Sequence, residues 1–217
     1  MECQLRISET NKYFLKIVLF QMLIFTVFRM IFMLKLGSLF DAVPWKDIFL
    51  TFIYGMRQDI SIIGTVVLPI YVLASVPFIG IEFNKILRNI ITVILATITI
   101  FFTVLLIIDI EFFAEFNSRL NLTLTEYLGN FDKIVAMVWN EYPVFLYLLI
   151  LIVVFVSLIW FFVRMNKKIK HTQVGIVSRI VTFILISGLL FLGARGRTGQ
   201  GVMNWGGVFF SSHNICN

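Results

Sequence analysis

Charged residues are scarce in this chain of 217 residues, since Asp, Glu, Lys and Arg make up only 14% of it, against about 25% in a typical soluble domain. Hydrophobic residues make up 59%, which excludes an ordinary soluble domain because so much apolar surface cannot all be kept from water. Only two cysteines and two histidines occur. Since none of them has metal-ligand spacing, the sequence gives no basis for a zinc site or a redox motif.

Five apolar stretches are each long enough to cross about 30 Å of hydrocarbon as a helix of about 20 residues. They cover residues 13–36, 48–78, 86–113, 144–163 and 174–192. Strands of a membrane barrel would alternate apolar and polar residues, whereas these stretches are apolar on every side. We therefore predict an all-α membrane protein with a five-helix transmembrane domain over residues 1–194, followed by a linker over residues 195–217.

Basic residues predict the orientation, because they stay on the cytoplasmic side of short loops. The densest basic cluster, "RMNKKIK" at residues 164–170, lies between the fourth and fifth stretches. This pattern predicts a cytoplasmic amino terminus and an extracytoplasmic carboxyl terminus. The net charge of +6 then reflects topology and attraction to anionic lipids, and no nucleic-acid partner is expected.

The segment between the third and fourth stretches, residues 114–143, is long for a simple connector. From Leu124 to Asn140 apolar residues recur at helical spacing, with polar residues on the other side. Trp139 and Tyr142 are residue types that settle at the level of lipid headgroups. We predict an amphipathic helix lying on the outer leaflet; the alternative is a helix packed on the outer ends of the bundle.

Two charges, Arg57 and Asp59, interrupt the second stretch in "YGMRQDISIIG" at residues 54–64. A charge at the bilayer centre costs about 2.5–3.5 kcal/mol, so it normally has a partner inside the bundle. Residues two apart on a helix point about 200° away from each other. Measured inward from the outer ends of the spans, Arg29 of the first stretch lies at a depth of about 10–15 Å, similar to that of Asp59. We therefore predict that Arg29 pairs with Asp59. Arg57 is expected to meet an acidic residue of the third stretch, either Asp109 or Glu111.

Together these charges form a candidate intramembrane polar network with two interpretations. The network either only fixes how the helices pack, or it lines an outward-opening cavity that binds the headgroup of a lipid through its phosphate. No nucleophile with an adjacent base and no metal-binding cluster occurs, so no catalytic residue is predicted. The candidate residues are Arg29, Arg57, Asp59, Asp109, Glu111 and Arg119.

Three stretches resemble the membrane domain of the lipoteichoic acid synthase family, which includes phosphoglycerol transferases. "FIYGMRQDISIIGTVVLPIYVL" is similar to the Gly-x-Arg-x-Asp-(Leu/Ile)-Ser stretch in the second helix of that family. "DIEFFAEFNSRLNLTLTEYLGNFDKIVAMVWNEYP" is similar to the family's exit from the third helix, with its acidic and aromatic residues, and "RGRTGQGVMNWGGVFFSSHNICN" to its linker. The resemblance covers the whole chain.

The resemblance implies an enzyme of the bacterial cytoplasmic membrane, in the alkaline phosphatase and sulfatase superfamily. In this family an extracytoplasmic α/β domain binds a divalent metal, usually manganese, and takes glycerol phosphate from phosphatidylglycerol on a threonine nucleophile. We expect this chain to be the membrane domain of such an enzyme, with membrane lipids and its own catalytic domain as partners and with no cofactor of its own. Alternatives are a phosphoethanolamine transferase, another sulfatase-like enzyme or a non-enzymatic membrane scaffold.

Overall fold

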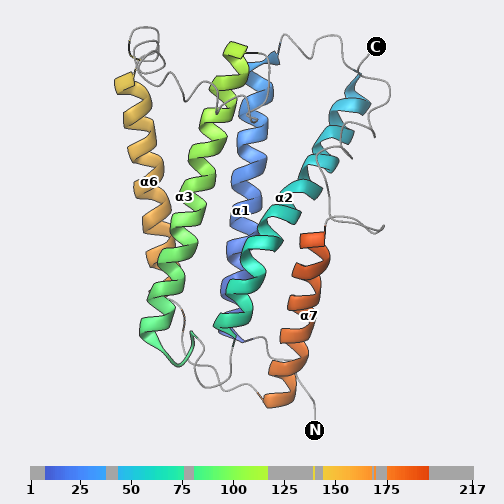
Figure 1. The fold of residues 1–217 in the computed structure, drawn as a ribbon, viewed down its shortest axis with the longest axis vertical. Helices are drawn as coiled ribbons and strands as arrows, with labels where there is room; N and C mark the ends of the chain where they lie inside the picture. Colours follow the sequence, from blue (N-terminus) through green and yellow to red (C-terminus); the bar gives the residue numbers. More distant parts are fainter. Residues whose placement is uncertain are drawn as a thin grey trace, which may run out of the picture. The chain divides into compact units, whose positions relative to one another are not determined.

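The computed structural model describes residues 8–37, 44–75, 81–116, 139, 144–167, 169 and 175–195. Five helices make up nearly all of this part, and no strand occurs in it (Figure 1). The predicted all-α class is therefore confirmed for the described residues. The helices are α1 (Glu9–Lys35), α2 (Trp45–Ala74), α3 (Lys85–Phe116), α6 (Val144–Lys167) and α7 (Ile176–Arg195).

Four of the helices, α1, α2, α3 and α7, are long and apolar enough to cross a membrane. Large apolar side chains are exposed along every helix, for example Leu19 at 60%, Phe49 at 67% and Leu189 at 68%. A water-soluble protein rarely exposes so much contiguous apolar surface. The helices therefore have the surface of a membrane protein. Whether α6, with 24 residues, forms the fifth span stays a prediction.

The helix ends differ from the predicted stretches by a few residues. Helix α2 ends at Ala74, before the predicted end at residue 78, and Ser75 caps it by donating its backbone N–H to the carbonyls of Tyr71 and Val72. The sequence explains the earlier end, because Pro77 lacks an N–H and disfavours helix in the residue before it.

The predicted amphipathic helix at residues 124–140 lies outside the described residues, apart from Trp139. The ring of Trp139 is 60% exposed, and its centroid lies 5.9 Å from that of Phe145 in the first turn of α6. The position of this helix on the outer leaflet therefore stays a prediction.

The chain divides into two compact units. The first contains the described residues from Ser8 to Thr26 and from Pro44 to Arg88, together with Ile169 and α7. The second contains the rest of α1, the rest of α3, Trp139 and α6. Helices α1 and α3 each contribute residues to both units.

Tyr71 of α2 is the centre of the first unit and is fully buried. Its hydroxyl donates to the Oδ1 atom of Asn11 in α1 at 2.8 Å. Its ring lies edge-on to Phe14 of α1, with centroids 5.2 Å apart, and stacks on Phe183 of α7 at 5.8 Å. One side chain thus joins three helices, and its single polar atom has a partner, as a buried hydroxyl requires.

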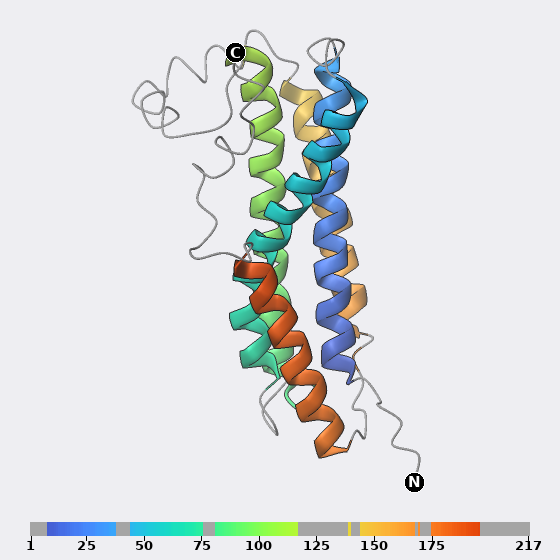
Figure 2. The same cartoon turned by 90° about the vertical axis from the view of Figure 1, so that its right-hand side faces the viewer.

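Helices α2 and α7 run side by side in opposite directions, with α7 beside the carboxyl-terminal half of α2 (Figures 1 and 2). Glycines allow this close approach: a Cβ atom on Gly64 would lie 2.7 Å from the backbone N of Ala194 and 2.8 Å from the backbone O of Leu190. A Cβ atom on Gly193 would lie 2.8 Å from the Ile60 side chain. Ser61 adds a hydrogen bond across the interface, donating to the Ala194 carbonyl at 2.7 Å. Small residues of this kind allow helices to approach each other closely in lipid.

The second unit holds α3 to α1 at one end and to α6 at the other. Phe32 of α1 lies edge-on to Phe113 of α3, with ring centroids 5.0 Å apart. At the opposite end of α3, the side-chain amide of Asn166 in α6 donates to the Oδ1 atom of Asn89 at 2.9 Å. The two contacts fix which end of each helix meets which.

We expect Gly64→Ala to lower the free energy of unfolding of the chain in detergent by about 1–3 kcal/mol. The added Cβ meets backbone atoms of α7, which cannot rotate away as a side chain does. Gly188→Ala is the matched control, because a Cβ atom there meets nothing within 4 Å. Thermal unfolding of both variants checks the interface, and equal effects would contradict it.

Candidate functional site

The structure describes five of the six residues of the candidate polar network, and Arg119 lies outside the described residues. Arg29 is partly exposed in α1, and Asp109 and Glu111 are partly exposed in the last turns of α3. In α2, Asp59 is 5% exposed and Arg57 is exposed. The predicted pairs, Arg29 with Asp59 and Arg57 with Asp109 or Glu111, each join a residue of one unit to a residue of the other, and they stay predictions.

Arg57 and Asp59 face different surroundings. Helix α2 meets α7 through Ile60, Ser61 and Gly64. Because each residue turns a helix by about 100°, Arg57 falls on this same face, four residues before Ser61, whereas Asp59 points roughly 140° away from it. Asp59 is therefore buried within the protein and Arg57 lies at its surface, and whether either charge lies in the hydrocarbon region stays a prediction.

The register of α2 against α7 gives the level of each charge. Ile60 lies against Gly193, and Gly64 lies against Leu190 and Ala194. Continuing this antiparallel register brings Asp59 level with Arg195, the last residue of α7, and puts Arg57 beyond the carboxyl end of α7. Arg57 is thus about 18 Å along α2 from Trp45, yet it lies past Arg195, the last residue that the structure describes in α7.

The position of Arg57 has an electrostatic consequence. The carboxyl end of a helix carries partial negative charge and unsatisfied carbonyl groups, so a nearby cation is stabilised by about 0.3–1 kcal/mol. Arg57 lies on the α7-facing side of α2 and one turn before Ser61, whose hydroxyl already bonds the Ala194 carbonyl. A guanidinium has five donors, so it can interact with the end of α7 and still present donors to a ligand.

Glu111 has a partner that the sequence did not suggest. Lys35, in the last turn of α1, donates to the Oε1 atom of Glu111 at 2.5 Å. The two side chains are 36% and 27% exposed, so solvent or headgroups reach this ion pair. It joins the carboxyl ends of α1 and α3 in the second unit, which gives Glu111 a packing role in addition to any role in binding.

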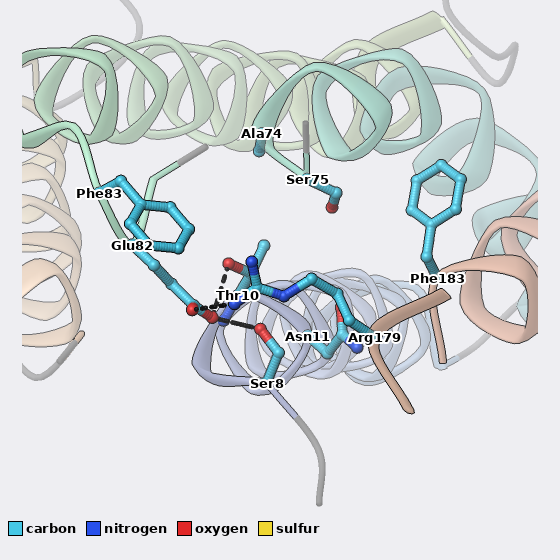
Figure 3. A pocket seen from close by; sticks show the side chains of 9 residues that line it. All are labelled: Ser8, Thr10, Asn11, Ala74, Ser75, Glu82, Phe83, Arg179 and Phe183. Atoms are coloured by element: carbon cyan, nitrogen blue, oxygen red, sulfur yellow. Dashed lines mark hydrogen bonds and ion pairs between the residues drawn. The ribbon is translucent and has the colours of Figure 1, made fainter. Parts of the chain in front are cut away.

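A second polar site, centred on Glu82, lies at the opposite end of the first unit (Figure 3). The Glu82 side chain is only 2% exposed. Its Oε1 atom accepts hydrogen bonds from the backbone N–H of Thr10 at 2.9 Å, from the Thr10 hydroxyl at 3.0 Å and from the Ser8 hydroxyl. Its Oε2 atom accepts from a guanidinium N–H of Arg179 at 3.1 Å. The carboxylate thus joins the start of α1 to α7.

Local physics explains the Glu82 site. Helix α1 begins at Glu9, and Ser8 is its N-cap, whose hydroxyl oxygen accepts the Thr10 N–H at 3.2 Å. The amino end of a helix carries partial positive charge, which favours the Glu82 carboxylate there. Arg179 neutralises the carboxylate from the other side, and its guanidinium carbon lies 5.2 Å from the centroid of the Phe83 ring.

The cavity beside Glu82 is small, about 20 Å³. A cavity of about 10–15 Å³ on this measure holds one water molecule, so the cavity has room for water. The Glu82 carboxylate, the Ser8 and Thr10 hydroxyls and the Arg179 guanidinium bind each other, which makes the site an anchor between helices. In the described ranges, no group of three His, Cys, Asp or Glu residues is placed to hold a metal ion.

The sequence contains two signals for this anchor. Ser8 and Thr10 directly precede an apolar stretch, which is the position of an N-cap. Arg179 lies inside the predicted span 174–192, where a charge needs a partner for the same physical reason as Arg57.

Comparison of the chain with protein-family models, curated proteins and solved structures finds no match.

We expect Glu82→Ala to lower the free energy of unfolding by about 3 kcal/mol, because it leaves the partly buried Arg179 without its carboxylate and removes a cap from α1. Hydrogen exchange at the start of α1 should become faster, since the Thr10 N–H loses its acceptor. Glu9→Ala is the control, because the exposed pair of Glu9 with Lys12 (2.8 Å) contributes less than about 1 kcal/mol. Comparable losses in both variants would refute the anchor.

The partner of Asp59 can be found with double-mutant cycles. We expect Asp59→Asn and Arg29→Gln to be coupled by about 1 kcal/mol or more in unfolding free energy. The cycle of Asp59→Asn with Arg195→Gln is the control: Arg195 is level with Asp59 on α7, but Asp59 points away from that face of α2. Stronger coupling to Arg195 would reject the predicted pair with Arg29.

Proposed function

We propose that this chain is the membrane domain of a lipid-dependent phosphoglycerol transferase of the lipoteichoic acid synthase type. Under this proposal five helices, α6 included, span the bacterial cytoplasmic membrane, with the amino terminus in the cytoplasm and the carboxyl terminus outside. The domain anchors an extracytoplasmic catalytic domain and engages the headgroup of phosphatidylglycerol. The divalent metal, manganese by resemblance, belongs to that catalytic domain.

The observation that carries the proposal is the placement of Arg57. It is the arginine of the Gly-x-Arg-x-Asp-Ile-Ser stretch, it is exposed, and the register of α2 with α7 puts it past the carboxyl end of α7. If α7, with 20 residues and a length of about 30 Å, crosses the bilayer, Arg57 lies at the level of the outer headgroups. Arginine is suited to phosphate there because its donors match two phosphate oxygens at once.

The length of α2 supports the same placement. Its 30 residues extend for about 45 Å, more than the hydrocarbon thickness of about 30 Å. Its first turns, which include Lys46 and Asp47, therefore reach beyond the level of α7. A rigid helix that carries an exposed guanidinium near the outer surface is suited to holding a donor lipid close to a catalytic domain above the membrane.

Pairing between ends supports the predicted alternation of the spans. The start of α1 and the start of α7 meet at Glu82 in the first unit, and the ends of α1 and α3 meet at Lys35 and Glu111 in the second. Each of these contacts joins ends that the predicted topology assigns to the same side of the membrane. Which side is cytoplasmic rests on the basic residues alone.

We expect Arg57→Ala, in the protein that includes the catalytic domain, to lower transfer from phosphatidylglycerol by at least about tenfold, the value of a charge-assisted hydrogen bond. Hydrolysis of a small soluble phosphodiester should be unchanged, because it needs no membrane-held headgroup. Lys46→Ala is the matched control, since Lys46 is an exposed cation in the first turn of the same helix. Equal loss of both activities in Arg57→Ala would sink the proposal.

If Arg57 has a role in packing alone, the Arg57→Ala variant should differ from its parent in stability and not in transfer activity. Losing an interaction with the carboxyl end of α7 would lower the melting temperature of Arg57→Ala, while transfer per folded molecule would stay at the level of the parent protein. Measuring the melting temperature beside the two activities therefore separates headgroup binding from helix capping.

A further inference from the structure

The exposed face of α6 changes character at its carboxyl end. Apolar residues form a stripe along it, with Leu149, Val153 and Val156 each more than half exposed. Trp160 continues the stripe and is 60% exposed. Arg164 and Lys167, both exposed, follow at spacings of four and three residues, on the same side of the helix.

Arg164 is held against the aromatic ring. Its guanidinium carbon lies 5.1 Å from the centroid of the Trp160 ring, a cation–π distance. The ring contact does not use all five N–H donors of the guanidinium, so donors remain for a ligand. Because the side chain is already ordered, less conformational entropy is lost when those donors bind a ligand.

The level of this cluster along the helix is marked by an independent contact. The Asn166 and Asn89 side chains bond each other in an exposed position between α6 and α3. An amide pair at the protein surface is costly to place in hydrocarbon, and tryptophan is enriched where helices leave the hydrocarbon region. Trp160, Arg164 and Lys167 therefore span the step from acyl chains to headgroups.

We propose that Trp160, Arg164 and Lys167 form a binding site for an anionic phospholipid of the surrounding leaflet. The acyl chains lie along the apolar stripe, the indole lies at the glycerol level, and the guanidinium and ammonium groups bind the phosphate. Charge complementarity selects the occupant: two cations at the end of an apolar stripe fit a molecule with a long apolar part and an anionic head. The site is in the second unit and does not rest on the proposed function.

The test uses Trp160 as the reporter. Trp45, Trp139 and Trp205 are replaced by Phe, and the chain is reconstituted in vesicles of phosphatidylcholine that contain either brominated phosphatidylglycerol or brominated phosphatidylcholine. Bromine quenches a nearby indole, so the quenching measures which lipid occupies the site. Each surface cation favours an anionic lipid by about fivefold, and we expect at least a fivefold preference for phosphatidylglycerol at Trp160.

The variant Arg164→Gln with Lys167→Gln should reduce this preference to about one. Lys12→Gln is the matched control: Lys12 is also an exposed cation near a helix end but is paired with Glu9, so its loss should leave the preference at Trp160 unchanged. Raising the salt concentration in the parent protein should weaken the preference, and this measurement needs no variant. Equal quenching by both lipids in the parent, or a preference that survives the double substitution, would overturn the site.

Discussion

The close approach of α2 and α7 is the constraint on which the placement of the charged groups depends. Two positions without side chains, Gly64 and Gly193, let the backbones meet, and the Ser61 hydroxyl fixes the register. A shift of one turn would move Arg57 by about 5.4 Å relative to the end of α7. Whether an arginine in an apolar helix is buried or lies at a boundary is therefore decided by the neighbouring helix and not by its own.

This dependence explains how far the sequence could predict the structure. Length and hydropathy are local properties, so the five helices were predicted with ends correct to within a few residues. The opposite directions of Arg57 and Asp59 also follow from one helix alone. Depth does not, because counting residues along one helix gives no information on the offset of the neighbouring helix α7. Glu82 was missed for a similar reason, since its donors come from segments more than 70 residues away in either direction.

Polar groups in the described part form hydrogen bonds of two kinds, one within a helix and one between helices. Within the helices, the hydroxyls of Thr99 and Thr103 bond carbonyls four residues earlier in their own helix, so they satisfy themselves without a neighbour. Between helices, polar contacts lie near helix ends at Glu82 in the first unit and at Lys35 and Asn166 in the second, and Ser61 in the middle of α2 bonds the last turn of α7. Lipid tails are as apolar as side chains, so the hydrophobic effect gives little drive for helices to associate in a bilayer. Specific end contacts and close-packed glycines then have to set the arrangement.

The Glu82 carboxylate differs physically from the guanidinium groups of Arg57 and Arg164. The Glu82 carboxylate already accepts hydrogen bonds from four donors inside the protein, so it has little capacity left for a ligand. Arg57 and Arg164 are exposed. Arg164 lies beside the Trp160 ring, which orients it, and for Arg57 the register of α2 against α7 offers the carboxyl end of α7 as such a support. Neither support can use all five donors of a guanidinium. A packing role and a binding role are therefore compatible in one arginine, because the contact that fixes the side chain also lowers the entropy lost when a phosphate binds it.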